Sequence, residues 1–278
     1  MINAETDVYA VIGYPVRHSL SPIIQNIAFN YYNLNAIYVA FEVNDLASAI
    51  KGVRALGIKG LSVTIPHKVE IMSFLDKVDE TAKEIGAVNT VVNKDGKLFG
   101  FNTDWLGVIL SLKEKGEISK KRFIVLGAGG AARAVVYGLK KEGAEIIILN
   151  RTYERGLALA NEFKVKALPL EKASEIKAYG LINTTPVGMW PKIEDTPLKK
   201  DILKNFSLVM DIVYHPLKTR LLREAEEMGC QTVIGLKMLV YQGAEQFRLW
   251  TGKEAPVEEM FKVAKEILKN EKKNPSFK

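Results

Sequence analysis

The amino-acid sequence predicts an α/β protein with two α/β domains, each built on a mostly parallel sheet. Short apolar runs of β-type residues alternate with helical patterns along the 278-residue chain, and this alternation is typical of parallel sheets covered by helices. A glycine-rich turn at 127–131 joins an apolar strand to a helix, as in dinucleotide-binding folds. A polar stretch at 116–121 interrupts the alternation, so we place the domain boundary within 102–120.

The strands are predicted from runs rich in Val, Ile and aromatic residues that end at Gly, Pro or Asn. Two of these runs flank the turn Asn93-Lys-Asp-Gly96 and are expected to form a hairpin. The predicted strands are 8–12, 37–41, 61–65, 88–92, 98–101, 123–126, 145–149, a short one near 165, 180–183, 208–213 and 232–234.

The helices are predicted from apolar residues at helical spacing and from capping residues. Ser21 is expected to cap the first helix, with Pro22 at its first position. The predicted helices are 22–31, 45–56, 69–75, 80–85, 105–115, 131–142, 153–163, 171–176, 217–228, 237–250 and 257–269. Periodicity does not indicate on which domain the last two helices pack.

Composition favours a cytoplasmic protein that binds small molecules. No apolar run approaches the roughly 18 residues of a membrane span, and the first residues lack the pattern of a signal peptide. The net charge is +7, but the lysines are scattered and no aromatic residues interleave with them, so we expect no nucleic-acid partner. Cys230, the only cysteine, is expected to be small and buried, no metal site is predicted, and 274–278 are expected to be frayed.

The glycine turn has the spacing of a dinucleotide-binding motif. Gly127, Gly129 and Ala132 fit G-x-G-x-x-[GA]: the first allows the tight turn, the second lets a pyrophosphate approach the backbone, and the third lets helix and strand pack closely. The free N–H groups at the start of the following helix would then face the anion.

The residues after the next strand favour NADP over NAD. NAD-binding proteins place an acidic residue there for the ribose hydroxyls, whereas this chain has Arg151, and Arg155 follows shortly after. Arginines pair with a 2′-phosphate, which an acidic side chain would repel. The alternative is that both arginines are only solvated side chains at a helix start.

Three clusters in the first domain contain polar residues that folding explains poorly. Ser19 flanks the predicted cap Ser21 but has no evident structural role, unless it is simply a loop serine. Thr64 lies in an apolar strand, and Lys68 lies where a helix is predicted to begin, which the helix dipole disfavours. A lysine in that position suggests an anionic or hydroxyl-bearing partner, although a plain surface lysine would look the same.

The third cluster comprises Asn89 and Asp104, which flank the predicted hairpin. Both can therefore reach the same end of the sheet, although Asp104 could also be only a helix cap. A Lys68–Asp104 pair beside a nicotinamide would be suited to alcohol–ketone interconversion, because hydride transfer to or from the cofactor requires a separate carrier for the proton.

Nearly the whole chain resembles the shikimate dehydrogenase family. Nine motifs occur in the family's order: 13–22 (GYPVRHSLSP), 63–68 (VTIPHK), 86–90 (GAVNT), 102–104 (NTD), 127–131 (GAGGA), 150–152 (NRT), 183–188 (NTTPVG), 211–214 (DIVY) and 235–243, which contains MLVYQG. The resemblance implies a substrate domain of 1–104 plus 238–278, to which the C-terminal helices return, and a Rossmann-type NADP-binding domain of 105–237.

The resemblance also implies an activity and a set of site residues. The family reduces 3-dehydroshikimate to shikimate with NADPH on the route to chorismate and the aromatic amino acids, and Lys68 would be the acid/base with Asp104 as its partner. The implied substrate-binding residues are Ser19, Ser21, Thr64, Asn89, Tyr214 and Gln242. The implied cofactor-binding residues are Gly127, Ala128, Gly129, Gly130, Ala131, Asn150, Arg151, Thr152, Arg155, Ile212, Gly235, Met238 and Glu80.

Two other functions stay open from the sequence. One is a quinate/shikimate dehydrogenase that uses NAD, although such relatives usually alter the serine pair or the arginines, which are intact here. The other is a non-catalytic NADP-binding protein, against which the Lys68, Asp104 and Gln242 set argues. The expected partners are small molecules, with neither nucleic acid nor membrane, and the protein is expected to be a monomer or a homodimer.

Overall fold

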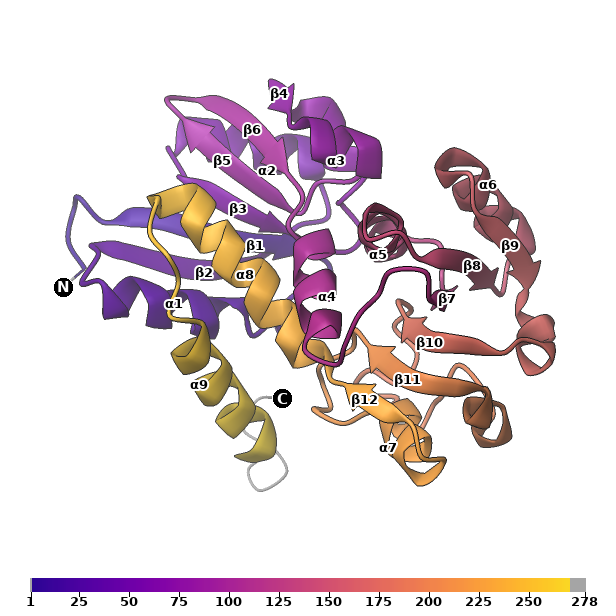
Figure 1. Ribbon diagram of the computed structural model, residues 1–278. Helices are drawn as coiled ribbons and strands as arrows, with labels where there is room; N and C mark the ends of the chain where they lie inside the picture. The colour runs from indigo at the N-terminus through magenta and orange to yellow at the C-terminus, as the bar shows by residue number, and fades with distance from the viewer. Residues whose placement is uncertain (1, 271–278) are drawn as a thin grey trace. The chain divides into compact units, whose positions relative to one another are not determined.

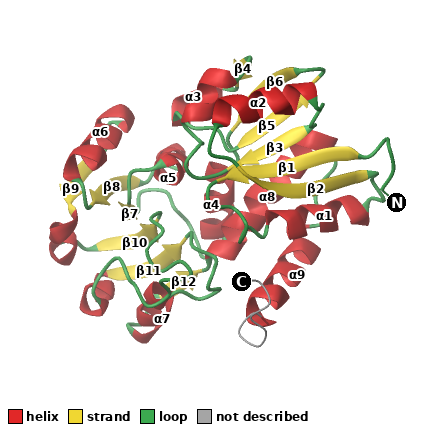
Figure 2. Ribbon diagram, turned by 180° about the vertical axis from the view of Figure 1, so that it is seen from behind, coloured by secondary structure: helices red, strands yellow, loops and turns green. Residues whose placement is uncertain are grey.

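The computed structural model describes residues 2–270; the end predicted as frayed, 274–278, lies outside them. The chain forms two compact units: unit 1 comprises Met1–Asp104 and Val240–Lys278, and unit 2 comprises Trp105–Leu239. Each unit contains one six-stranded sheet with helices packed against it (Figures 1 and 2). The predicted fold class, two α/β domains with mostly parallel sheets, is confirmed.

The sheet of unit 1 has the strand order β2-β1-β3-β5-β6-β4. Its first three strands are parallel to one another, whereas β5 runs antiparallel to both of its neighbours. The predicted hairpin joins β5 to β6 through Asp95 and Gly96, both with positive φ (52° and 83°), the turn geometry that Asp-Gly favours. The strands are β1 (Asp7–Gly13), β2 (Ala36–Glu42), β3 (Gly60–Val63), β4 (Lys77–Val78), β5 (Thr90–Lys94) and β6 (Lys97–Phe101).

Helix α9 and α8 from Val240 onward belong to unit 1. Helix α9 packs against α1, and Trp250 of α8 donates a hydrogen bond to the carbonyl of Val91 in β5. Gly60 of β3 makes room for that indole, because a Cβ there would lie 2.4 Å from Trp250 Nε1. The helices of this unit are α1 (Ser21–Tyr31), α2 (Leu46–Ala55), α3 (Glu80–Ile85), the second half of α8 (Gly235–Thr251) and α9 (Val257–Asn270).

Unit 2 has an entirely parallel sheet in the order β12-β11-β10-β7-β8-β9. This is the Rossmann order, in which the direction of winding reverses between the first and fourth strands, here β7 and β10. The strands are β7 (Arg122–Leu126), β8 (Glu145–Asn150), β9 (Lys166–Pro169), β10 (Ala178–Asn183), β11 (Phe206–Asp211) and β12 (Gln231–Val233).

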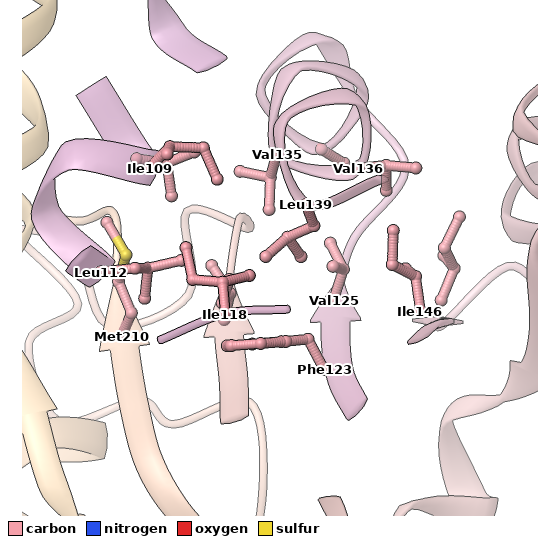
Figure 3. Packing of buried hydrophobic residues seen from close by; sticks show 14 of the residues in the cluster. Ile109, Leu112, Ile118, Phe123, Val125, Val135, Val136, Leu139, Ile146 and Met210 are labelled. Carbon is pink, nitrogen blue, oxygen red and sulfur yellow. The ribbon is translucent and has the colours of Figure 1, made fainter. Parts of the chain in front are cut away.

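Helices cover both faces of this sheet. Figure 3 shows Val135 and Leu139 of α5 on the side of the helix that faces Val125 and Phe123 of β7, and Val136 belongs to the same cluster. The same cluster also includes Ile109 and Leu112 of α4, and all seven side chains are at most 2% exposed. The helices of this unit are α4 (Asp104–Lys113), of which Asp104 itself belongs to unit 1, α5 (Gly130–Lys141), α6 (Tyr153–Phe163) and α7 (Arg220–Glu227).

Several predicted elements differ in type or extent. The segments predicted as helices at 69–75 and 171–176 are short 3₁₀ helices, η1 (Glu70–Phe74) and η2 (Leu170–Glu175), a conformation common in brief connectors. The helix predicted to begin at 217 begins at Arg220, because the Thr219 side chain accepts a hydrogen bond from the backbone of Leu222 and caps it there. Strand β4, only two residues long, was not predicted.

Candidate functional site

One edge of the unit 1 sheet collects most of the polar residues singled out in that domain. Strands β1, β3 and β6 all end at this edge, and β5 begins there because it is antiparallel to its neighbours. The loops after β1 and β3 carry Ser19 and Lys68, the residue before β5 is Asn89, and Asp104 follows β6. The carboxyl ends of strands are the usual ligand side of an open α/β sheet.

Lys68 and Asp104 form an ion pair at this edge. The Lys68 Nζ donates to Asp104 Oδ2 over 2.5 Å, and the two side chains are 15% and 5% exposed. Lys68 does not begin a helix as predicted: it lies in the turn at 65–69, two residues before η1. The helix-dipole argument for its placement is therefore wrong, because a five-residue 3₁₀ helix has no macrodipole comparable to that of an α-helix. Its electrostatic partner is Asp104.

Asn89 holds the second oxygen of the same carboxylate. Its Nδ2 donates to Asp104 Oδ1 over 2.9 Å and to Gln242 Oε1 over 3.2 Å. The Asp104 carboxylate does not act as a helix cap, because its two oxygens accept hydrogen bonds from Lys68 and Asn89. The Asn102 side chain instead accepts from the Asp104 backbone N–H over 3.0 Å. Lys68, Asn89, Asp104 and Gln242 are therefore one connected cluster.

The serine pair has the reverse of the predicted structural roles. Ser21 is the first residue of α1 and is preceded by Leu20, whose backbone is helical and whose side chain makes no capping hydrogen bond. The Ser19 hydroxyl accepts from the Ser21 backbone N–H over 3.2 Å, so Ser19, not Ser21, satisfies a free donor at the start of the helix. The prediction of Ser21 as N-cap is wrong, because the chain enters the helix one residue earlier.

Thr64 lies just past the end of β3 and packs against the end of β1. Its backbone N–H donates to the carbonyl of Ile12 over 3.0 Å. A Cβ built on Gly13 would lie 2.4 Å from Thr64 Cγ2, so glycine is required at 13 for this close approach. The threonine is half-buried at the same sheet edge as Lys68.

The prediction missed the residues that surround Asn89. Thr90 and Thr103 both contact Asn89 Oδ1, and Gln246 donates to the Asn89 carbonyl over 3.2 Å. Gln246 carries a signal in the sequence: it lies four residues after Gln242 and therefore on the same face of the predicted helix.

The glycine turn of unit 2 lies at the end of β7, next to the reversal of winding. Gly127 has φ of +110°, and a Cβ there would lie 2.6 Å from Thr184 Oγ1, so this position requires glycine. Gly129 is the N-cap of α5 with an extended backbone, and a Cβ there would meet no atom within 4 Å. The space in front of Gly129 is thus open, which suits the close approach of a pyrophosphate to Gly129 and to the backbone of Ala128, Gly130 and Ala131.

The residues after β8 present cations to solvent. Arg151 and Arg155 are exposed, and within residues 2–270 neither forms an ion pair with a carboxylate. Asn150 stabilises the turn that follows β8, because its Nδ2 donates to the Thr152 carbonyl over 2.7 Å. Thr152 is the N-cap of α6, without a side-chain capping bond. These arginines are therefore available to an anionic ligand.

Ile212, Gly235 and Met238 lie together in unit 2. A Cβ on Gly235 would lie 2.4 Å from the Ile212 carbonyl oxygen, so glycine lets the start of α8 approach the end of β11. Met238 is buried in the same hydrophobic cluster against which Ile212 packs. Tyr214, half-buried, follows Ile212 in unit 2. Glu80 lies in unit 1, at the start of α3, where it forms an exposed ion pair with Lys83.

Asp211, the last residue of β11, has a buried side-chain carboxyl. Asp211 accepts hydrogen bonds from Asn183 Nδ2, the Val213 backbone N–H and the Thr219 hydroxyl, at 3.0, 3.0 and 2.7 Å. Burial away from water raises the pKa of Asp211 to about 7, although these three donors act in the opposite direction. The bonds connect the end of β10, the loop after β11 and the N-cap of α7 to one carboxyl group.

Residues 2–270 contain neither a membrane-spanning helix nor a metal-binding cluster. Within residues 2–270, no helix is long and apolar enough to cross a membrane. No cluster of three or more His, Cys, Asp or Glu side chains in the same range could hold a metal ion. Cys230 is buried, as predicted.

A Rossmann sheet with an open glycine turn, in a chain that also carries a buried Lys–Asp pair, defines a dinucleotide-dependent oxidoreductase. Family models match the chain in three segments: "Shikimate dehydrogenase substrate binding domain" at 11–91, "Shikimate / quinate 5-dehydrogenase" at 110–186 and "Shikimate 5'-dehydrogenase C-terminal domain" at 235–265. The chain is 47% identical to the NADP⁺-dependent shikimate dehydrogenase of Aquifex aeolicus over 92% of its own length and 95% of that protein. It belongs to the shikimate dehydrogenase family.

Solved structures agree with this assignment. A crystal structure of a shikimate dehydrogenase in complex with NADP⁺ has a TM-score of 0.91 and 44% identity, and the match covers 96% of this chain and 98% of that one. The Thermus thermophilus enzyme in complex with NADP(H) and shikimate has a TM-score of 0.87 and 42% identity, with 94% and 99% covered.

Proposed function

We propose that this protein catalyses the reversible NADPH-dependent reduction of 3-dehydroshikimate to shikimate, on the route to chorismate and the aromatic amino acids. The observation that carries the proposal is the Lys68–Asp104–Asn89 cluster at the ligand edge of the unit 1 sheet, in a chain that is 47% identical to an NADP⁺-dependent shikimate dehydrogenase. Unit 1 would bind the substrate, and unit 2 would bind the cofactor.

Lys68 supplies the proton in this proposal. NADPH, when bound, supplies a hydride to the ketone carbon, and the oxygen of that carbonyl then needs a proton. The Lys68 ammonium donates it, and in the reverse direction the neutral amine accepts it. Asp104 holds the ammonium through the 2.5 Å contact with Oδ2 and compensates its charge. Asn89 keeps the carboxylate oriented through Oδ1.

The remaining polar residues at this edge would bind the substrate. The hydroxyls of Ser19 and Ser21 would hold its carboxylate, with Tyr214 of unit 2 as a further contact to that group. Thr64, Asn89 and Gln242 would bind its ring hydroxyls together with Asp104. The hydrogen bond from Asn89 to Gln242 Oε1 supports this role for Gln242, because it ties the glutamine to the Lys68–Asp104 pair.

The residues of unit 2 fit NADP. The open space at Gly129 and the start of α5 suit the pyrophosphate. Arg151 and Arg155, exposed and without carboxylate partners in the described part of the chain, suit a 2′-phosphate, with Asn150 and Thr152 shaping the turn. Ile212, Gly235 and Met238 would line the nicotinamide pocket. Glu80 has the least support as a cofactor contact, because Lys83 already pairs with it.

Initial rates of oxidation test the proposal. Shikimate and quinate are each assayed with NADP⁺ and with NAD⁺. Of these four combinations, fast turnover is expected only for shikimate with NADP⁺. Comparable rates with quinate or NAD⁺ would move the protein to the quinate/shikimate dehydrogenases. NADPH binding without turnover of either acid would leave a non-catalytic cofactor-binding protein.

A further inference from the structure

A row of buried polar side chains runs through unit 1 to Asn89. It begins at Tyr38 in β2, whose hydroxyl donates to Ser62 Oγ in β3 over 2.5 Å. The Ser62 hydroxyl donates to Gln246 Oε1 in α8 over 2.6 Å. Gln246 Nε2 then donates to Thr90 Oγ1 over 3.1 Å. Each of these four side chains is at most 6% exposed, so water does not offer them alternative partners.

The donors and acceptors in this row have a single direction. Gln246 Nε2 also faces the carbonyl oxygen of Asn89, at 3.2 Å. A carbonyl can only accept, so the Gln246 amide cannot turn its own oxygen toward Asn89 without placing two acceptors together. Burial raises the pKa of Tyr38 well above its usual value, which keeps its hydroxyl protonated as the first donor.

The same direction continues into the site. The Thr90 hydroxyl accepts from Gln246 and donates to Asn89 Oδ1 over 2.7 Å, and the Thr103 backbone N–H donates to the same oxygen over 2.8 Å. With Oδ1 occupied in this way, Asn89 Nδ2 is turned toward Asp104 Oδ1, Gln242 Oε1 and the Thr103 hydroxyl oxygen. Asn89 therefore presents a donor, and not an acceptor, to the carboxylate that holds Lys68.

We propose that Gln246 is a positioning residue, which acts through Thr90 and Asn89 to orient Asp104 and Gln242. Gln246 holds Asn89 at two points, its backbone carbonyl directly and its side-chain oxygen through Thr90. Without these bonds the Asn89 side chain keeps the Thr103 donor but loses the group that aligns the Thr90 hydroxyl. The effect of Gln246 on the rate of the reaction rests on the proposed function, whereas its effect on the orientation of Asn89 does not.

The matched variants are Gln246→Met and Gln25→Met. Both glutamines are buried in unit 1, at 1% and 0% exposure, and methionine keeps their approximate length and volume. Gln25 Nε2 donates to the Gly243 carbonyl of the same helix, α8, over 2.9 Å, but Gln25 has no part in the row. Both variants should unfold thermally within a few degrees of each other, so differences at Asn89 report the row itself.

The first measurement is hydrogen exchange of the Asn89 side-chain amide in the ligand-free, ¹⁵N-labelled protein, with the resonance assigned from Asn89→Ser. Exchange is expected to be at least about tenfold faster in Gln246→Met than in the parent protein, and unchanged in Gln25→Met, because loss of one net hydrogen bond changes an opening equilibrium by about this factor. Equal protection in all three proteins would overturn the proposal.

The second measurement separates positioning from the reaction. With shikimate and NADP⁺, Gln246→Met is expected to lower kcat by about tenfold and to leave KM for NADP⁺ unchanged. An equal loss in Gln25→Met would overturn the proposal.

A parent protein that does not turn over shikimate would refute the proposed function only, since the exchange measurement still decides the role of Gln246. If Gln246→Met does not fold, Ser62→Ala replaces it; this variant removes the donor to Gln246 Oε1 and also the acceptor of the Tyr38 hydroxyl. It should accelerate exchange at Asn89, and unchanged exchange would overturn the proposal.

Discussion

The side-chain nitrogen of Lys68 lies 2.5 Å from Asp104 Oδ2, although 36 residues separate the two in the chain. Both side chains are largely buried, and the other carboxylate oxygen accepts from Asn89. A buried ion pair is weak evidence for stability, because desolvation offsets much of the attraction. The pair lies at the carboxyl ends of β1, β3 and β6, which is the usual ligand side of an open α/β sheet, and this position favours a chemical role instead.

Replacing Lys68 tests that role. Lys68→Ala is expected to lower kcat for shikimate oxidation by about 10²–10⁴-fold with little change in shikimate affinity, since the group acts on the reacting oxygen. The variant also leaves Asp104 buried without its cation, so thermal unfolding is measured alongside.

Lys59→Ala is the control, because Lys59 is an exposed lysine of the same unit whose ion partner is Asp7. It should retain the parent kcat. Near-normal kcat in Lys68→Ala would remove the acid/base assignment.

The two exposed arginines after β8 should discriminate between the cofactors. Changing Arg151 and Arg155 to Gln is expected to weaken NADPH binding by roughly 10-fold or more per arginine, from the loss of charge-assisted hydrogen bonds. NADH, which lacks the 2′-phosphate, should bind about as before. Titration calorimetry with each cofactor measures both affinities.

Arg122→Gln serves as the matched control. Arg122 begins β7, at the end of the strand opposite the glycine turn, and pairs with Glu145. If the double variant lost NADPH and NADH affinity equally, the 2′-phosphate assignment would be wrong.

The two glycines of the turn should respond differently to alanine. Gly127→Ala is expected to destabilise unit 2 by a few kcal/mol, because φ is +110° and the added Cβ would lie 2.6 Å from Thr184 Oγ1. Gly129→Ala should change stability by no more than about 1 kcal/mol, because its backbone is extended and no atom lies within 4 Å, although alanine is a poorer N-cap than glycine.

Gly129→Ala should nevertheless weaken NADPH binding, because the new methyl group occupies the space through which a pyrophosphate would approach. Urea unfolding and a fluorescence titration with NADPH make the comparison. A stable Gly129→Ala protein with parent NADPH affinity would argue against pyrophosphate binding at this turn.

Asp211 should make stability fall as the pH rises. Burial raises its folded pKa to about 7, whereas the unfolded value is about 4. Its contribution to stability is therefore complete below about pH 4 and is lost as the pH rises through 7. Asp211→Asn keeps an acceptor for Asn183 and Val213 and does not titrate, so its stability relative to the parent should increase from pH 5 to pH 8 by roughly 1–3 kcal/mol.

Urea unfolding at both pH values measures this difference. Asp45→Asn is the control: hydrogen bonds to Ser48 lower the pKa of Asp45, so the stability it contributes is lost only as the pH falls below its unfolded value of about 4. The difference between Asp45→Asn and the parent should therefore be the same at pH 5 and pH 8. A difference between parent and Asp211→Asn that did not change with pH would contradict the shift at Asp211.

Local patterns were enough to predict much of this protein. The apolar strand, the glycine turn and the helix that begins at Gly130 depend on neighbouring residues, because φ at Gly127 and the packing of Ala132 are local requirements. The Asp-Gly hairpin was predicted for the same reason. Where only a few residues separate two elements, as at Ser21 or η1, local signals were ambiguous, and the predicted helix start and helix type were wrong.

The sequence by itself determined the fold class, the Rossmann turn and the residue types available for chemistry. Only the tertiary structure decided that Asp104 receives both Lys68 and Asn89, and that Gln246, 157 residues from Asn89, orients it. The physical reason is that hydrogen bonds act over about 3 Å, while the strand order that brings these residues together is set by long-range packing. Nothing in the local sequence of Gln246 identifies its partners.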